Sequence, residues 1–173
     1  GEAQSVEILS VHPFKTRRPG YGDKMRLMTW NLWWRFGEWE SRQPAILQTL
    51  ETANPDVVCL QEVWSSEDGT DQAHELAQAL GMNYVRTPER WWNGHSFGNA
   101  ILSRDPISTS NAIQLPPTDG PGTRWALSAI IDRNEVRIPV ICTHLDYRFD
   151  QSQRRQEQVR ALFDLVQSEH NAE

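Results

Sequence analysis

Three side chains able to bind a metal ion or a phosphate stand at the ends of apolar, strand-like runs. Asn31 ends one run, Glu62 follows the apolar residues 57–60, and His144 closes a third run. A buried carboxylate is costly unless a cation or hydrogen-bond donors stabilise it. Carboxylate and amide oxygens suit a hard cation such as Mg²⁺, which keeps several waters and bridges to phosphate, and an imidazole can donate to a phosphate oxygen. The three residues are therefore candidates for a metal-assisted phosphate site.

Each of these residues also has an ordinary structural explanation. A glutamate just past a strand is commonly solvated, an asparagine there commonly forms a turn, and a histidine commonly makes a local hydrogen bond. Taken singly, the ordinary explanation is the stronger one for each residue. Only their combination with the flanking sequences favours a functional site.

The elements that must position these residues form a mixed α/β layer. Apolar runs and alternation predict strands over residues 25–32, 57–60, 83–87, 97–103, 107–115, 124–132 and 136–143. Pro139, inside the last of these, favours an edge position or a bulge. Helical spacing predicts helices over 43–53 (capped by Ser41), 71–80 (capped by Thr70 or Asp71 and ended by Gly81) and 152–168.

The strand at residues 57–60 is apolar at every position, so it must be covered on both faces. The few helices predicted cannot cover both faces of about six strands. We therefore expect one sheet face to need another cover.

Composition sets limits on the class of protein. The chain has 173 residues, a net charge of −6 and a pI near 5.4, which fits one acidic globular domain. The acidic balance argues against a dedicated nucleic-acid binder but does not exclude a nuclease, because a bound cation can meet the phosphate. No apolar run approaches the ~18 residues of a membrane span. Cys59 and Cys142 lie in apolar runs and are most simply unpaired core residues, which weakly favours a cytoplasmic location.

Eight tryptophans is a high count, and four of them form the adjacent pairs Trp33-Trp34 and Trp91-Trp92. Neighbouring rings in a strand or loop cannot both enter one core. Some of these rings should face a groove or a partner, where they could stack on bases, line a lipid groove or cover a sugar. Trp91 and Trp92 are candidates for substrate binding, with core packing as the alternative.

The strand segments carry a resemblance to a known family. MRLMTWNLWW, PDVVCLQEVW, FGNAILSRDPI and ICTHLDYRF, in this order and spacing, resemble the endonuclease/exonuclease/phosphatase (DNase I-like) superfamily over about residues 25–162. The resemblance implies a four-layer α/β sandwich with a divalent-metal site between the sheet edges, which hydrolyses phosphodiesters or phosphomonoesters. This chain is expected to supply one mixed sheet with its helices.

The resemblance also implies roles for individual residues. Glu62 matches the family's metal-binding glutamate and Asn31 the asparagine beside the metal, so both are expected at an Mg²⁺ (or Mn²⁺) ion. His144 matches the histidine that contacts the phosphate or assists the reaction. These three are the candidate catalytic residues. Three others are expected to support the site: Asn99, Asp146 and Arg155.

The family pattern continues with Gly-Asp-x-Asn and Ser-Asp-His segments, which these 173 residues do not contain. We therefore expect an N-terminal strand and loop over residues 1–24, then the N-terminal half of the family's domain over 25–173. We further expect this piece to be inactive alone and to self-associate through an exposed sheet face. The alternative is a half-fold that binds or assembles without catalysis.

Overall fold

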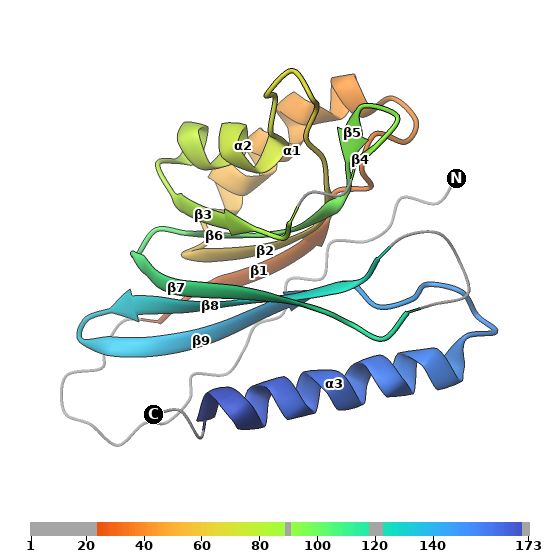
Figure 1. The fold of residues 1–173 in the computed structure, drawn as a ribbon. Helices are drawn as coiled ribbons and strands as arrows, with labels where there is room; N and C mark the ends of the chain where they lie inside the picture. The colour runs from red at the N-terminus through yellow and green to blue at the C-terminus, as the bar shows by residue number, and fades with distance from the viewer. Residues whose placement is uncertain (1–23, 89–90, 118–122, 171–173) are drawn as a thin grey trace.

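The computed structural model describes residues 24–88, 91–117 and 123–170, so the strand predicted before residue 24 lies outside the described residues. The described elements follow one another along the chain as strands and three longer helices (Figure 1). The strands are β1 (Leu27–Asn31), β2 (Val57–Val63), β3 (Asn83–Arg86), β4 (Trp91–Trp92), β5 (His95–Ser96), β6 (Gly98–Ser103), β7 (Ile107–Gln114), β8 (Trp125–Arg133) and β9 (Val136–Thr143). The helices are α1 (Trp39–Ala53), α2 (Gln72–Leu80) and α3 (Ser152–His170).

The first sheet has four strands in the order β1-β2-β6-β3. β1 and β2 run parallel, while β6 is antiparallel to both of its neighbours. Helices α1 and α2 cover one face of this sheet, as Figure 1 shows. The parallel pairing matters for the site because it brings the carboxyl ends of β1 and β2 to the same edge.

The second sheet has three antiparallel strands in the order β7-β8-β9. It lies between the first sheet and α3, which packs on its outer face (Figure 1). Pro139 lies in β9, which is an edge strand within the described part of the chain, as its missing N–H predicts.

The chain thus forms four layers: two helices, a sheet, a second sheet and a helix. The four-layer α/β architecture predicted from sequence is confirmed, but the expectation that the chain supplies one mixed sheet is wrong. Sequence periodicity identified strands 107–115, 124–132 and 136–143 correctly and did not assign them to a separate sheet. Because those strands cover the face that was expected to be bare, self-association cannot use that face.

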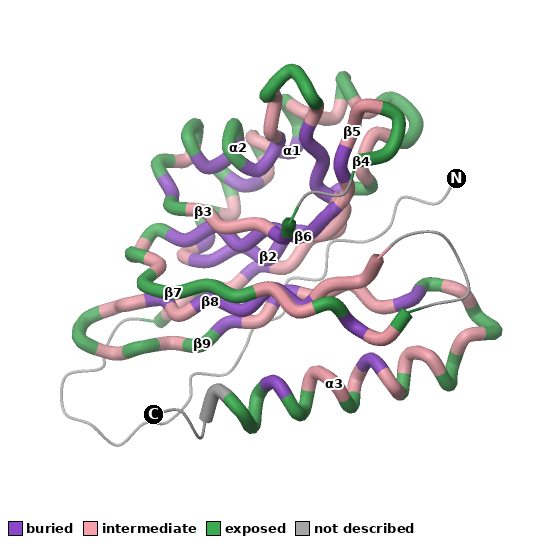
Figure 2. Tube along the Cα trace, viewed as in Figure 1, coloured by how far each residue is buried: buried purple, intermediate pink, exposed green. Residues whose placement is uncertain are grey.

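Alternation along β2 explains why every position of its apolar run is buried. Val58 and Leu60 point to the helices, whereas Val57 and Cys59 point to the second sheet. The inter-sheet layer is completed from β6 and from the second sheet by Ile101, Leu127, Ala129, Ile131, Val140 and Cys142. Figure 2 shows this burial concentrated in the middle strands of both sheets.

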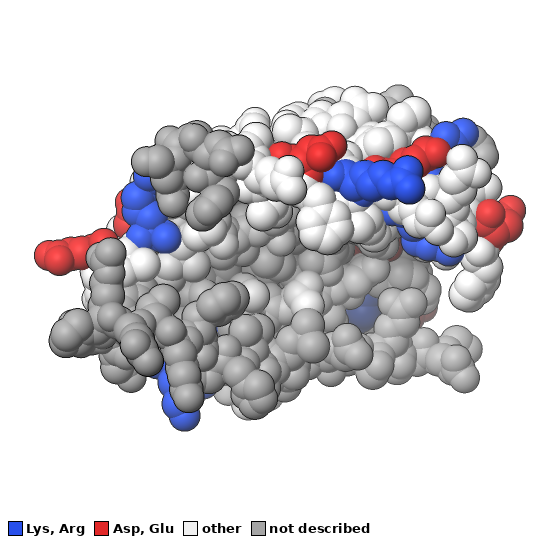
Figure 3. Space-filling view, turned by 90° about the horizontal axis from the view of Figure 1, so that it is seen from below, with Lys and Arg blue, Asp and Glu red and all other residues white. Residues whose placement is uncertain are grey.

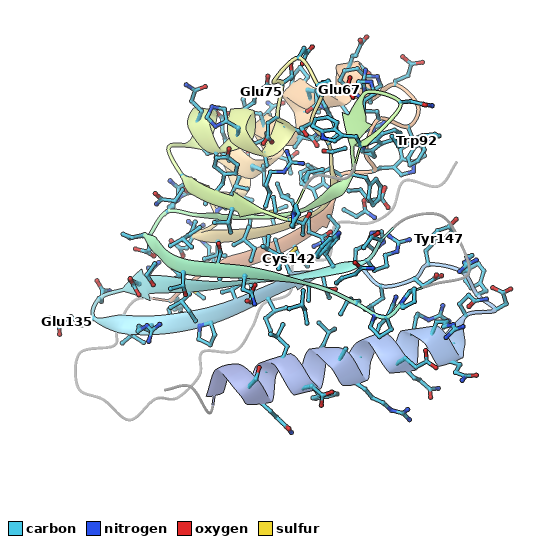
Figure 4. The ribbon with its side chains drawn as sticks, in the orientation of Figure 1. Glu67, Glu75, Trp92, Glu135, Cys142 and Tyr147 are labelled. Atoms are coloured by element: carbon cyan, nitrogen blue, oxygen red, sulfur yellow. The ribbon has the colours of Figure 1, made fainter. Side chains whose placement is uncertain are left out.

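The two cysteines are free thiols in this inter-sheet core, as predicted. A hydrogen bond with Cys142, and then burial, raise the pKa of the Cys59 thiol well above its ordinary value. Both side chains are buried and pack as small apolar residues. Figure 4 shows Cys142 between the sheets.

The helix caps follow local chemistry with one exception. The Asp71 side chain accepts from the backbone N–H groups of Ala73 and His74, and Gly81 ends α2 in the left-handed conformation. Helix α1 begins earlier than predicted, at Trp39, so Ser41 lies within its first turn and is not its cap. None of the helices in the described ranges is long and apolar enough to cross a bilayer.

Packing between the sheets should dominate stability. Ile101→Ala removes a fully buried side chain from this layer and should lower the free energy of unfolding by about 2–5 kcal/mol. Val166→Ala, at a half-exposed position of α3, should change it by less than about 0.5 kcal/mol. Urea unfolding followed by circular dichroism measures both, and equal effects would contradict the inter-sheet core.

Candidate active site

The ends of β1, β2, β8 and β9 meet at one end of the sandwich. Asn31 pairs in register with Gln61, which places it beside Glu62. Within the second sheet, the pairing of Ala126 with Thr143 brings His144 next to the start of β8. The three residues predicted from sequence are therefore brought together, with Nδ1 of His144 3.7 Å from Oε1 of Glu62.

Glu62 occupies an unusual position. Its φ of 55° lies in the left-handed region, and the β2–β6 register shifts between Leu60 and Val63. A bulge turns the side chain away from the regular alternation of the strand and commonly occurs beside active sites. The sequence gives no sign of this strain.

The Glu62 carboxylate is half satisfied. Asn31 Nδ2 donates to Oε1 at 3.0 Å, whereas Oε2 is buried without a hydrogen-bond partner in the described residues. Burial raises the pKa of Glu62, and the Asn31 hydrogen bond and the Arg124 charge oppose this increase. A buried oxygen that lacks a donor is where a cation fits.

Asn31 is held between Glu62 and the following loop. While its amide donates to Glu62, its Oδ1 accepts from the backbone N–H of Trp33 at 2.8 Å. These two contacts fix the orientation of the amide and of the carboxylate. They make Asn31 a positioning residue for Glu62; direct contact between Asn31 and a metal stays a prediction.

His144 is neutral at physiological pH. Burial, followed by the charge of Arg124, lowers its pKa to about 4, and Asp146 opposes that decrease. The guanidinium nitrogen Nη1 of Arg124 lies 3.3 Å from Nδ1 of His144. Because a guanidinium has donors only, Nδ1 must accept, so the neutral ring carries its proton on Nε2 and can donate it to a ligand.

Arg124 is the residue that sequence reasoning missed. It precedes β8, and burial lowers its pKa while the charges of Asp146 and Glu62 raise it. Its Nε is buried with no hydrogen-bond partner among the described residues. A small hollow that opens to solvent is lined by Phe97, Gly98, Asn99, Thr123, Arg124, Trp125 and His144. The signal available was a single arginine directly before an apolar strand.

The three predicted supporting residues hold the strands and loops around this hollow. Asn99 is buried and donates to the Trp125 carbonyl at 3.1 Å. Asp146 is buried, pairs with Arg148 at 2.9 Å and receives a charge interaction from Arg124. Arg155 donates to the backbone carbonyls of Asp146 and Arg148, so this guanidinium holds the loop after β9 through its backbone.

Trp91 and Trp92 form the first strand of a two-stranded hairpin, β4–β5, that sequence reasoning missed. Its turn, Asn93-Gly94, has positive φ at both residues, which suits a two-residue hairpin. Trp92 packs on Trp34 with ring centroids 6.1 Å apart. Figure 4 shows Trp92 on this hairpin and Tyr147, from the loop after β9, at the same end of the sandwich.

The described residues contain no group of three or more His, Cys, Asp or Glu side chains that could hold a metal. A metal at this site would therefore be bound by Glu62 together with other oxygen ligands, such as those of water or phosphate. That donor set suits Mg²⁺, which is commonly bound through one or two carboxylates plus waters and phosphate oxygens. The free Oε2 of Glu62 fits this role.

Comparison with known proteins identifies the family of the chain. The model of the endonuclease/exonuclease/phosphatase family matches residues 28–171, and the chain belongs to this family, whose members are phosphoesterases. No match was found among curated protein sequences.

Solved structures agree with this assignment. An endonuclease/exonuclease/phosphatase from Beutenbergia cavernae is 25% identical, with a TM-score of 0.67 over 81% of this chain and 43% of its own. The human Nocturnin catalytic domain with bound sulfate anion is 24% identical, with a TM-score of 0.70 over 83% of this chain and 58% of its own. TDP2 of D. rerio, complexed with a single-strand DNA product, is 20% identical, with a TM-score of 0.65 over 82% of this chain and 54% of its own. The chain thus spans about half the length of these structures.

The depressed pKa of His144 predicts how stability depends on pH. The unfolded chain takes up a proton near pH 6.5 and the folded chain only near pH 4. The contribution of neutral His144 is therefore complete above pH 6.5 and is lost as the pH falls towards 4, by up to about 3 kcal/mol. Urea unfolding in EDTA at pH 7.5 and pH 4.5 measures this loss.

His144→Gln should lose less stability than wild type over that range. Because the pKa of Glu62 is raised, its contribution to the free energy of unfolding increases as the pH falls, opposite to that of His144. This contribution is present in both proteins and therefore cancels when their pH profiles are compared. Identical pH profiles for the two proteins would contradict the burial of a neutral imidazole.

Proposed function

We propose that this chain carries the metal-binding and phosphate-binding part of a divalent-metal-dependent phosphoester hydrolase. The observation that carries the proposal is the buried Glu62 carboxylate, with one oxygen unpaired, beside Asn31, His144 and Arg124. Without a cation this arrangement only costs stability, because the carboxylate is desolvated and incompletely bonded.

Four residues of the site would each have a separate role in binding the metal and the phosphate. Glu62, oriented by Asn31, would hold a Mg²⁺ or Mn²⁺ ion. His144 would donate from Nε2 to a phosphate oxygen, and Arg124 would offer its cationic N–H groups from the neighbouring strand. These donors are fixed before the reaction, so they stabilise charge as it develops on the phosphate without reorganising.

The ion, when bound, would offset negative charge on the phosphate oxygens and on the leaving oxygen. Among the described residues Glu62 belongs to no group of three or more His, Cys, Asp or Glu side chains that could hold a metal. We expect the groups that activate the attacking water to come from elsewhere. We accordingly expect the 173 residues alone to bind metal and phosphate but to hydrolyse at or near the background rate.

The comparisons support a phosphoester substrate and leave its class open. The sulfate in Nocturnin is a tetrahedral oxyanion like phosphate, and the D. rerio TDP2 structure contains a DNA product. Nuclease, phospholipid phosphodiesterase and small-molecule phosphatase activities all use such a centre. The cations of the site, Arg124 and the proposed metal, would meet the phosphate locally despite the net charge of −6.

Metal binding should stabilise the fold through Glu62. Millimolar Mg²⁺ or Mn²⁺ should raise the melting temperature of the wild-type chain in differential scanning fluorimetry, because the ion binds the folded state alone. Glu62→Gln should abolish this increase. In EDTA the same variant should be as stable as wild type or more stable, because it removes a buried, half-bonded charge. An equal Mg²⁺ response in both proteins would exclude Glu62 as the ligand.

Catalysis should require the same residues. We expect the product of the complete reading frame to cleave phosphoesters with Mg²⁺ and not with EDTA, in a panel of oligonucleotide, phospholipid and sugar-phosphate substrates. Glu62→Gln, His144→Ala and Arg124→Ala should each lower kcat/KM by about 100-fold or more. Val166→Ala, on α3, should leave it unchanged.

Retained activity in both Glu62→Gln and His144→Ala would rule out these roles. If metal and phosphate leave stability unchanged and no substrate is cleaved, the non-catalytic binding or assembly module gains support. Sedimentation would then test self-association, for which the described structure offers the edge strands β1 and β3 of the first sheet and β7 and β9 of the second.

A further inference from the structure

A group of aromatic side chains stands beside the site. We call it the aromatic wall, and it comprises Trp33, Trp34, Phe36, Trp92 and Phe97. Trp34 is its centre, with ring centroids 5.3 Å from Phe36, 6.1 Å from Trp92 and 6.2 Å from Phe97. Trp33 is 53% exposed, Phe36 46% and Trp92 66%. Large aromatic faces exposed together are costly in water and mark a binding surface.

The wall is continuous with the phosphate site at two points. Trp34 N–H donates to the Glu62 carbonyl at 3.0 Å, and Trp33 N–H donates to Asn31 Oδ1 at 2.8 Å. At the other side, Phe97 both contacts Trp34 and lines the hollow that contains Arg124 and His144. A ligand whose phosphate occupies that hollow would have its next group against the wall.

The wall is held in a strained and fixed arrangement. Trp33 and Trp34 have φ of 61° and 40°, a region that bulky side chains seldom adopt. Arg42 fixes this turn by donating to the carbonyls of Trp33, Trp34 and Phe36. Such strain persists where the surrounding structure enforces it, and it commonly occurs at ligand sites. The rings are therefore positioned before a ligand arrives.

The indole N–H at the centre of the wall, and the imidazole behind it, are already engaged. Trp34 Nε1 donates to the Ser96 carbonyl at 2.7 Å, and His95 contacts Arg35 and Ser66. Recognition of a sugar depends on hydrogen bonds to hydroxyls, which these groups cannot readily give. Recognition of a planar base by stacking needs only ring faces.

Charge around the wall disfavours a lipid surface. Exposed acidic residues flank it: Glu38 and Glu40 next to Trp39, and Glu67 and Asp68 in the loop that contacts the hairpin through Gly94. Figure 4 shows Glu67 close to the β4–β5 hairpin. Anionic membranes attract basic patches. On the face where α3 lies, Figure 3 shows both acidic and basic side chains among the described residues.

We propose that the aromatic wall binds the base of a nucleotide or single-stranded nucleic acid by stacking, next to the phosphate site. This inference rests on the proposed function and names its substrate class. Every base has a π face, so the wall should distinguish a ligand that has a base from one that lacks it. It should distinguish only weakly between different bases.

The test separates base from phosphate by equilibrium binding in Mg²⁺. Isothermal titration compares 5′-AMP with ribose 5-phosphate, which has the same phosphate and sugar and no base. The wild-type chain should bind 5′-AMP about tenfold more tightly than ribose 5-phosphate. Trp92→Leu, which keeps an apolar side chain and removes the ring, should bring the two affinities within about twofold, and Trp92→Phe should restore most of the difference.

The controls distinguish the two proposals. Phe163→Ala removes an equally exposed ring from α3 and should leave both affinities unchanged. Arg124→Ala should weaken both ligands alike, because it acts on the phosphate. Circular dichroism confirms that each variant is folded.

Each other outcome has a defined meaning. Equal binding of the two ligands by wild type, or a difference that survives Trp92→Leu, would overturn stacking and leave the phosphate site intact. No binding of either ligand would overturn both proposals. Sedimentation with phosphatidylcholine vesicles completes the test, because vesicle binding lost in Trp92→Leu would show a membrane surface in place of a base site.

Discussion

The arrangement of this end of the molecule depends on one buried carboxylate. Glu62 is desolvated enough for its pKa to rise, yet only one of its oxygens has a hydrogen-bond donor. Its backbone also lies in a strained conformation at a bulge. Each of these features costs stability, and a fold keeps such costs where the group has a task that a bonded surface residue could not perform. The divalent ion that we propose, shared with a phosphate, would pair with the free oxygen and offset the excess charge.

The sandwich supplies the constraint that makes this possible. Asn31 and Glu62 reach the same edge because β1 and β2 are parallel, and His144 and Arg124 face them from the second sheet. The packed layer of Val57, Ile101, Leu127 and their neighbours fixes the separation of the two sheets. A shift between the sheets would separate the carboxylate from its two basic neighbours, so the inter-sheet core and the site are mechanically linked.

The electrostatic state of the site follows from burial more than from pairing. His144 lies beside a carboxylate, which would ordinarily favour its protonation, but desolvation and the nearby guanidinium outweigh that attraction and lower its pKa to about 4. Arg124, which cannot give up its proton, remains the permanent cation. The site therefore presents one fixed positive charge, one neutral donor and one anion with a free oxygen. This combination suits an oxyanion bridged by a metal.

The sequence by itself determined the polar residues at the strand ends, most element boundaries, the α2 cap and the family, because these depend on local periodicity and on short motifs. It did not determine that the last strands form a second sheet, since alternation is the same whichever sheet a strand joins. It also did not identify Arg124, which looks like an ordinary charged residue in the sequence. Arg124 lies 20 positions before His144, and only the pairing of the strands brings the two side chains within 3.3 Å of each other. The strain at Trp33, Trp34 and Glu62 likewise arises only when the bulge, the loop and the opposite sheet are assembled, because no local preference of these residues would produce it.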